Sequence, residues 1–235
     1  MKIIKFLRIA SICSFLGAIT TILLLYLPSA VADGFEAQAA LHSNKLYITK
    51  LWILFFHPQL NFIATIGIAV LFFNKFPEIV IPALLLSFLY TVAEMAQQAF
   101  LIDAVNIYWR PGYLNEVDEI KRASFVTNLS SVEAIWESMY LIFQYGFALG
   151  SILIGFLLLK TKNYAKWIGI SKIIIGISVV MAFLYNYMGV EPLLGSINWF
   201  YAWIYPVLQP AVRIAIGIWL WKQLTLINLQ RPIII

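Results

Sequence analysis

Residues 141–159, LIFQYGFALGSILIGFLLL, form a run of 19 residues without a charged side chain. As a helix this run is about 28 Å long, close to the roughly 30 Å thickness of the hydrocarbon core of a bilayer. The rest of the chain has the same character, because 62% of its 235 residues are hydrophobic and only 11% are charged. Soluble domains carry about 45–50% apolar and about 25% charged residues. The sequence therefore predicts a protein whose solvent is lipid.

Six apolar stretches of sufficient length to cross a bilayer divide the chain. We predict an all-α fold, a polytopic transmembrane helix bundle that forms a single domain over residues 1–235. Its spans are predicted at about 9–27, 51–73, 79–102, 131–159, 165–188 and 197–221. Within them, Pro58 is expected to interrupt the second span. Pro206 and Pro210 are expected to break the hydrogen-bond ladder of the sixth span and kink it.

The longest polar stretch, residues 103–130, is predicted to be an extracytoplasmic loop. Arg110-Pro111-Gly112 in this stretch is typical of a turn. Asn115 with Asp118 is expected to cap a short helix through Thr127 that shows Val117, Ile120 and Phe125 to the membrane surface. The spacing of residues 130–133, SSVE, is that of a capping box and predicts the start of the next helix.

Basic residues predict the orientation, because Lys and Arg are enriched on the cytoplasmic side of membrane proteins. Of the 16 Lys and Arg residues, nine lie on the side of both termini, five lie on the other side, and two lie within spans. Both termini are therefore predicted to be cytoplasmic. The first span has a second interpretation, since Ala30-Val31-Ala32 resembles a signal-peptide cleavage site. Its apolar run of about 19 residues exceeds the usual 7–15 of a signal peptide, which favours a retained helix.

The scarce residue types exclude several function classes. A lone cysteine, Cys13, excludes an intramolecular disulfide and cysteine-rich metal sites, and the two histidines lack zinc-site spacing. The sequence contains no P-loop, dinucleotide-binding glycine motif or nucleophile elbow. The net charge is +5, and the basic residues lie beside the spans. The lipid bilayer is therefore the expected partner, and nucleic acid is not. We expect no metal, no cofactor and no enzymatic activity.

Polar side chains recur at helical spacing in three predicted spans, and such faces should point at one another rather than at lipid. The candidate ligand-binding residues on them are Glu94, Gln98, Glu137, Tyr140, Gln144, Tyr205, Gln209 and Arg213. Glu94 and Arg213 are expected to form a direct ion pair that fixes helix register, or to line a pocket that opens outward. His57 is expected at a helix end near the interface. Lys172 is expected to snorkel to the headgroups.

These patterns favour a non-enzymatic function, namely binding of a small amphiphile or a partner membrane protein through an outward-facing polar interior. One alternative is a small transporter or proton-coupled carrier that uses Glu94 and Arg213. A second alternative is an intramembrane enzyme that uses Glu94, Glu137 and His57. Gly146 and Gly150 have the GxxxG spacing that lets helices approach closely, and a homodimer through them is a further expectation.

Several segments carry a resemblance to known sequences: FALGSILIGFLLLK (147–160), YAKWIGIS (164–171), Ala93-Glu94, YPVLQ (205–209) and IWLWK (218–222). They resemble a bacterial family of six-span membrane proteins without an assigned function, over nearly the whole chain. Pro210 and Arg213 depart from the pattern of that family, in which an acidic residue follows the glutamine. The resemblance implies a multi-pass protein of the bacterial inner membrane and supplies no catalytic residues.

Overall fold

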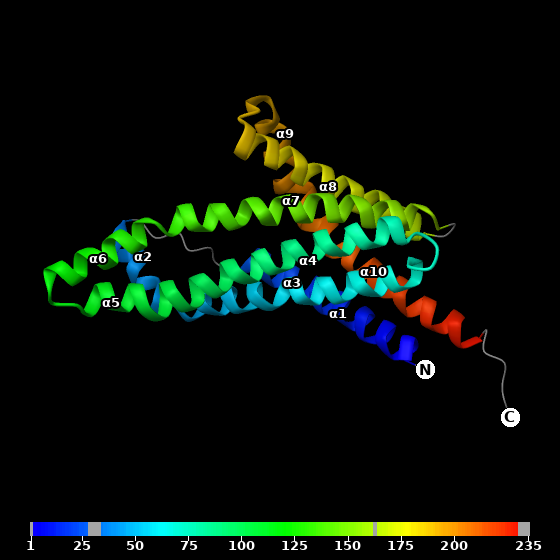
Figure 1. The fold of residues 1–235 in the computed structure, drawn as a ribbon, viewed down its shortest axis with the longest axis horizontal. Helices are drawn as coiled ribbons and strands as arrows, with labels where there is room; N and C mark the ends of the chain where they lie inside the picture. Colours follow the sequence, from blue (N-terminus) through cyan, green and yellow to red (C-terminus); the bar gives the residue numbers. More distant parts are fainter. Residues whose placement is uncertain (1, 28–33, 162–163, 230–235) are drawn as a thin grey trace.

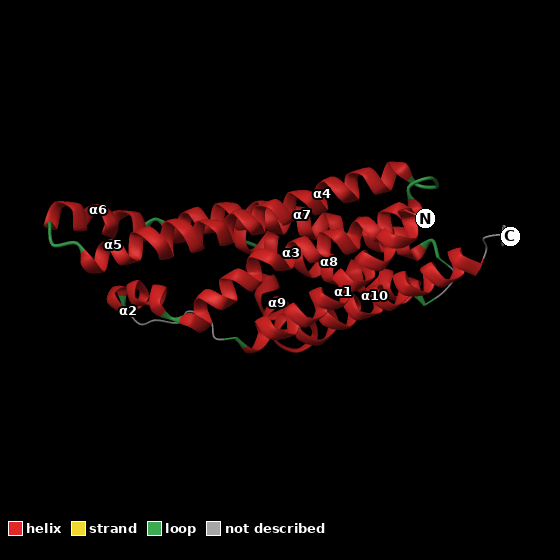
Figure 2. Cartoon of the chain, turned by 90° about the horizontal axis from the view of Figure 1, so that it is seen from below, coloured by secondary structure: helices red, strands yellow, loops and turns green. Residues whose placement is uncertain are grey.

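The computed structural model of the chain describes residues 2–27, 34–161 and 164–229, and no strand occurs in these ranges (Figures 1 and 2). Its α-helices are α1 (Lys2–Tyr26), α2 (Phe35–Ala39), α3 (Lys45–Phe72), α4 (Pro77–Phe100), α5 (Arg110–Asn115), α6 (Glu119–Ser130), α7 (Val132–Leu159), α8 (Ala165–Met188), α9 (Leu194–Trp199) and α10 (Tyr205–Leu229). Two short 3-10 turns are η1 (Ala40–Ser43) and η3 (Glu191–Leu193), and two π-helical segments are η2 (Leu101–Trp109) and η4 (Phe200–Ile204). The predicted all-α fold is confirmed.

Six helices are long and apolar enough to cross a membrane, which confirms the predicted number of spans. Two of them are much longer than a bilayer needs, with 39 residues in Pro77–Asn115 and 41 residues in Glu119–Leu159. At 1.5 Å per residue each is about 60 Å long, about twice the hydrocarbon core. Their far ends therefore extend beyond the other helices as a projecting hairpin, which we define as residues 101–130 (left in Figure 1).

The predicted turn at Arg110-Pro111-Gly112 is wrong, because these residues open helix α5. Pro111 is the second residue of α5, which directly continues the π-helical segment η2. The chain reverses instead at residues 116–118, and Asp118 caps α6 as predicted, accepting hydrogen bonds from the N–H groups of Ile120 and Lys121. Val117 and Ile120 are therefore exposed at the tip of the projecting hairpin.

Two further local predictions are wrong. The backbone of Ser131 is already helical, and its hydroxyl donates to the Asn128 carbonyl at 2.7 Å instead of forming a capping box. Helix α3 continues through Pro58, which is buried. In the sixth span the π-helical segment η4 lies immediately before Pro206, and α10 continues through Pro210, where the ladder was expected to break. Neighbouring helices make such irregularities tolerable inside a membrane.

The spanning helices form a ring in the order α10, α1, α3, α4, α7 and α8, and a smaller contact between α8 and α10 closes it. Glycines allow the tightest of these contacts. A Cβ atom at Gly155 of α7 would lie 2.8 Å from the carbonyl oxygen of Gly169 on α8. Gly146 and Gly150 pack on α4, where a Cβ at Gly146 would lie 2.8 Å from the Leu86 carbonyl oxygen. The predicted close packing is therefore present inside one chain, and the homodimer through these two glycines stays a prediction.

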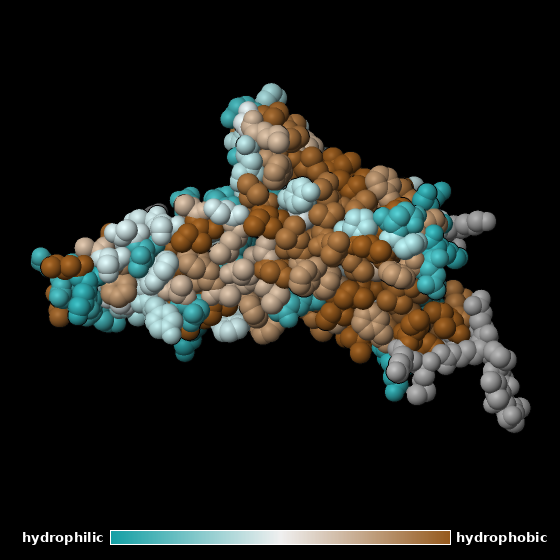
Figure 3. All heavy atoms as spheres, in the orientation of Figure 1, coloured by the Kyte–Doolittle hydropathy of each residue, from teal (hydrophilic) through white to brown (hydrophobic). Residues whose placement is uncertain are grey.

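Helix α1 begins and α10 ends at the same end of the bundle, opposite the projecting hairpin (Figure 1). Apolar side chains cover most of the visible face of the bundle, and hydrophilic ones gather on the projecting hairpin and near the opposite end (Figure 3). This distribution matches a helix bundle surrounded by lipid with both ends in water. The candidate cleavage site Ala30-Val31-Ala32 lies outside the described residues.

Candidate functional site

Arg213 lies inside the bundle, where its side chain runs from α10 towards α1 and α3. Its Nη1 donates to the Gly17 carbonyl oxygen at 3.1 Å and lies 2.5 Å from His57 Nε2. On the other side of the imidazole, His57 Nδ1 lies 2.6 Å from the Thr20 hydroxyl oxygen. We refer to Gly17, Thr20, His57 and Arg213 as the arginine cluster. It joins three helices through one guanidinium and one imidazole.

The hydrogen bonds of the arginine cluster determine the form of His57. Arg213 only donates, so Nε2 has to accept and carries no proton. The Thr20 hydroxyl faces the carbonyl oxygens of Leu16 and Gly17, both at 3.0 Å, and donates its proton there. It therefore accepts from Nδ1–H, which makes His57 a neutral imidazole. The placement of His57 at a helix end near the interface is wrong, because this side chain lies in the middle of α3 and is only 6% exposed.

Small and polar residues of α1 allow this close approach. Ser14 donates to the Arg213 carbonyl oxygen at 2.6 Å and Ser11 donates to that of Gly217 at 2.7 Å. A Cβ at Gly17 would lie 2.6 Å from Asn61 Oδ1, so the Asn61 side chain occupies the space that glycine leaves where α1 crosses α3. The backbones of α1 and α10 are thus held together beside the guanidinium.

A small enclosed cavity lies next to the arginine cluster, with a volume of about 30 Å³. Its polar lining comes from five helices and includes Ser14, Asn61, Tyr90, Lys172, Gln209 and Arg213. Lys172 does not snorkel to the headgroups as expected. Its Nζ donates to Ser151 Oγ at 3.1 Å and lies 5.5 Å from the centre of the Phe147 ring. We refer to this space as the central cavity.

The expected direct ion pair between Glu94 and Arg213 is wrong. Among the described residues the one ion pair is that of Arg122 and Glu36, at 3.6 Å. Glu94 is half-buried on α4 and interacts with Arg213 through space, without contact. Of the other candidates, Gln209 lines the central cavity together with Arg213.

The remaining candidate residues lie outside the central cavity. Tyr140 belongs to an aromatic stack on α7, with ring centres 4.7 Å from Trp136 and 5.4 Å from Phe143. Glu137 is exposed and accepts a hydrogen bond from Tyr187, and the Tyr205 ring packs against Tyr201. Gln98 and Gln144 are buried, each with a side-chain oxygen that has no hydrogen-bond partner. In the described chain no hydrogen bond or ion pair joins Glu94 or Glu137 to His57.

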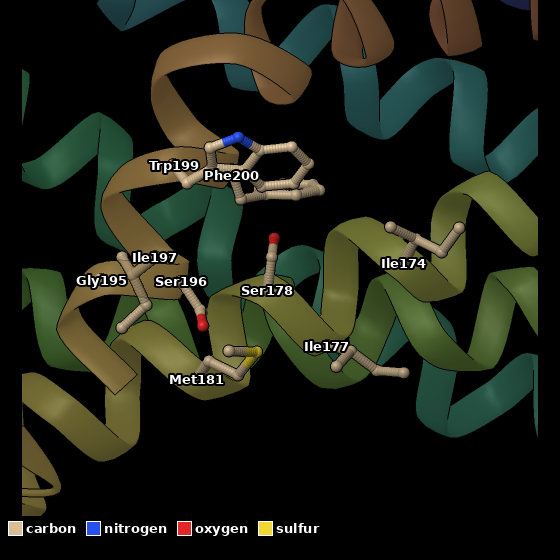
Figure 4. Close-up of a pocket in the computed structure, with 9 residues that line it drawn as sticks. All are labelled: Ile174, Ile177, Ser178, Met181, Gly195, Ser196, Ile197, Trp199 and Phe200. Atoms are coloured by element: carbon tan, nitrogen blue, oxygen red, sulfur yellow. The ribbon is translucent and has the colours of Figure 1, made fainter. Parts of the chain in front are cut away.

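A larger pocket opens on the outside of the bundle between α8, α9 and η4 (Figure 4). We call it the lateral pocket. Its volume is about 510 Å³, and it is lined by Ile174, Ile177, Ser178, Met181, Gly195, Ser196, Ile197, Trp199 and Phe200. The Ser178 hydroxyl points into it, and the rings of Trp199 and Phe200 lie across from α8 (Figure 4). No charged side chain is among the residues that line it.

Sequence reasoning missed most of the arginine cluster and the lateral pocket. Two sequence patterns indicated the arginine cluster. His57, Asn61 and Thr65 follow one another at steps of four on α3, and Ser11, Ser14 and Gly17 at steps of three on α1. Such stripes of small or polar residues mark a face turned away from lipid. The lateral pocket has no comparable signal, because its lining is as apolar as a lipid-facing surface.

Comparisons of the chain with protein-family models, with curated proteins and with solved structures found no match. The resemblance to a bacterial six-span family therefore stays a prediction. Fold and side-chain geometry define a class, a multi-pass membrane protein of the helix-bundle type.

Proposed function

We propose that this membrane protein binds an uncharged amphiphile, taken from the surrounding bilayer, in the lateral pocket. The observation that carries the proposal is the pocket itself, because about 510 Å³ lies within the usual 300–1,000 Å³ of small-molecule sites. Ile174 and Ile177 lie near the middle of α8, so lipid rather than water reaches this opening. The occupant is therefore a molecule dissolved in the membrane.

The lining of the pocket defines the chemistry of the occupant. Seven of the nine lining residues lack a polar side-chain group that accepts hydrogen bonds, which suits a hydrocarbon chain or ring system. Ser178 donates to the Ile175 carbonyl oxygen at 2.8 Å and can still accept a hydrogen bond, and Ser196 supplies a second hydroxyl, so one uncharged polar group of the ligand finds hydrogen-bonding partners. Without an Arg or Lys in the lining, an ionised headgroup would lie there without a counter-charge. We infer an amphiphile with a hydroxyl, ester or carbonyl group.

This site differs from the outward-facing polar interior expected from the sequence. The central cavity holds about 30 Å³, which is too small for an amphiphile. The lateral pocket opens towards lipid instead. A partner membrane protein was the second occupant expected from the sequence, and it would compete with the amphiphile for the same apolar surface.

Photolabelling tests the proposal. The full chain, reconstituted in lipid nanodiscs, is exposed to a monoacylglycerol with a diazirine in its acyl chain, and the labelled peptides are mapped by mass spectrometry. We expect saturable labelling of residues 174–181 and 195–200 that excess unlabelled monoacylglycerol abolishes. Labelling spread evenly over lipid-facing helices, without competition, would overturn the proposal.

Gly195 offers a matched pair of variants for this experiment. A Cβ at this position has nothing within 4 Å, so the added side chain extends into open space without moving the backbone. Gly195→Trp fills the pocket and should abolish the saturable labelling. Gly195→Ala leaves the pocket open and should retain it. A partner helix in the pocket would block labelling of both the wild-type chain and the alanine variant.

A carrier is the second candidate function, and the irregular part of the last span favours it. The π-helical segment η4 lies directly before Pro206, and π-helical turns are frequent at functional sites. In this scheme Glu94 carries the proton. Proton flux into proteoliposomes, reported by a pH-sensitive dye, should be lost in Glu94→Gln and retained in Glu133→Gln, since Glu133 is exposed. Flux equal to that of protein-free vesicles would exclude the carrier.

We also propose that the protein lies in a bacterial inner membrane with both termini in the cytoplasm. The unequal distribution of Lys and Arg supports this orientation. Alkaline phosphatase fused after residue 117, at the tip of the projecting hairpin, should be active. The same enzyme fused after residue 75, in the turn between α3 and α4, should be inactive, and the reverse result would invert the topology.

A further inference from the structure

The central cavity carries an inference separate from the lateral pocket, because it brings two cationic side chains to one enclosed space. Arg213 from α10 and Lys172 from α8 both line it. Neither has a carboxylate within 4.0 Å among the described residues, where Arg122 and Glu36 make the one ion pair. Charged groups inside a membrane normally pair with a group of opposite charge. Two cations at one cavity without such a partner therefore need an explanation.

The existing contacts of the two cations leave donors unused. All side-chain hydrogen bonds that Arg213 makes with described residues run through Nη1, to Gly17 and His57, so Nη2 and Nε have no acceptor among those residues. Lys172 has one acceptor, Ser151 Oγ, for its three N–H groups. The side chains of Asn61, Tyr90 and Gln209 add further potential donors to the lining. The cavity is therefore rich in donors.

The charge balance favours a negative occupant. Tyr90 and Gln209 carry no charge in their ordinary forms, and His57 is neutral as argued above. The acidic side chain whose field reaches Arg213 is Glu94, without direct contact. Two cations against one carboxylate leave one positive charge inside the bundle, which is costly in a medium of low dielectric constant.

The volume of the cavity limits the size of the occupant. A space of about 10–15 Å³ is enough for one water molecule. About 30 Å³ therefore accommodates a monatomic anion, with at most one water beside it. A sulfate, a phosphate or the headgroup of a lipid does not fit. We propose that the central cavity binds one halide-sized anion, such as chloride, between Lys172 and Arg213.

The test is a chloride titration of thermal stability. The purified full chain is kept in detergent at constant ionic strength, while sodium chloride replaces sodium gluconate. A ligand that binds only the folded state raises the midpoint of unfolding with its concentration, by about 3–6 °C at ten times its Kd for a chain of this size. Sodium sulfate should cause no such rise. A rise that does not saturate, or that sulfate reproduces, would overturn the proposal.

Two lysine variants separate this site from a general effect of salt. Lys172→Met keeps the length of the side chain, removes its charge and should abolish the chloride-dependent rise. Lys166→Met removes an exposed lysine of the same helix and should retain the rise. Retention of the full response in Lys172→Met would overturn the proposal. The pocket-filling variant Gly195→Trp should also retain the chloride-dependent rise. The test of the anion site is therefore independent of the proposed amphiphile site.

Anomalous scattering tests the proposed anion site even if the Lys172→Met variant fails to fold. Crystals of the wild-type chain grown in sodium bromide are measured at the bromine absorption edge. We expect one anomalous peak within hydrogen-bonding distance of Lys172 Nζ and of Arg213 Nε or Nη2. A central cavity without an anomalous peak at saturating bromide would overturn the proposal.

Discussion

The projecting hairpin and the interior of the bundle hold a guanidinium in opposite ways. Arg122 of the hairpin is 46% exposed, lies 3.6 Å from Glu36 and stacks 4.6 Å from the centre of the Tyr113 ring. Arg213 of the bundle is 9% exposed and is held by a carbonyl oxygen and a neutral imidazole. Both arginines link helices that are distant in sequence, but only the exposed one has a carboxylate partner.

The difference shows what each environment does with charge. In water an ion pair gains little, because the solvent already stabilises both charges. Inside the bundle a neutral acceptor satisfies the hydrogen bonds of Arg213 and leaves its positive charge uncancelled. Electrostatic interactions are stronger there, since the effective dielectric constant is lower. The interior therefore retains an electrostatic potential that a paired arginine would have lost.

Among the variants that test this comparison, replacement of Arg213 should cause the largest loss of stability. Arg213→Met removes the hydrogen bonds to His57 and Gly17 and enlarges the central cavity. We expect the free energy of unfolding to fall by about 2–4 kcal/mol. Thermal unfolding in detergent, followed by tryptophan fluorescence, measures it. A more stable variant would instead show that desolvation of the charge outweighs its contacts.

The next largest loss of stability is expected where α7 and α8 pack closely. Gly155→Val places a Cβ 2.8 Å from the Gly169 carbonyl oxygen, so the two helices have to separate. Overpacking of this kind costs about 1–3 kcal/mol. Gly195→Val is the matched control, because nothing lies within 4 Å of a Cβ there. Equal unfolding temperatures for the two variants would contradict the assignment of a tight helix contact to Gly155.

The hydroxyl of Thr20 tests the second hydrogen bond of the imidazole. Thr20→Val keeps the shape of the side chain and leaves the Nδ1–H of His57 without its acceptor at 2.6 Å. We expect a loss of about 1–2 kcal/mol in the same unfolding assay. Thr127→Val, in the exposed part of α6, removes a hydroxyl bonded only to the Ala123 carbonyl and should change stability by less than about 0.5 kcal/mol. A neutral result for both variants would argue against the derived tautomer.

The smallest effect is expected at the exposed ion pair. Arg122→Gln removes the contact with Glu36 and should lower stability by less than about 1 kcal/mol. Added salt should reduce the difference in stability between the variant and the wild type, because salt screens exposed charges. Unfolding curves at low and high salt provide the measurement. A loss as large as that of Arg213→Met would remove the distinction drawn between the two regions.

The spans were predictable because their signal is local. Length and hydropathy of a single stretch are enough to identify a membrane-crossing helix, and all six are present. The partners of Glu94, His57 and Lys172 were not predictable, because they depend on which helix faces which. His57 meets Arg213 across 156 residues of sequence, and no periodicity within α3 contains that information.

Local turn signals failed in the projecting hairpin for a different reason. Arg110-Pro111-Gly112 has the composition of a turn, but tertiary contacts keep these residues helical. A Cβ at Gly112 would lie 2.5 Å from the Phe125 ring, so the glycine makes room for packing of α6 on α5. Lack of a side chain therefore serves a helix contact here, not a reversal of the chain.

The hydroxyls of Ser11 and Ser14 also have a consequence for how the protein is made. Their acceptors on α10 lie 206 and 199 residues later in the chain. At a synthesis rate of about 5–20 residues per second, α1 leaves the ribosome about 10–40 s before its partner helix. During that time the Ser11 and Ser14 hydroxyls lack these acceptors. The contact between the first and the last span therefore forms only after α10 has been made, when nearly the whole chain has been translated.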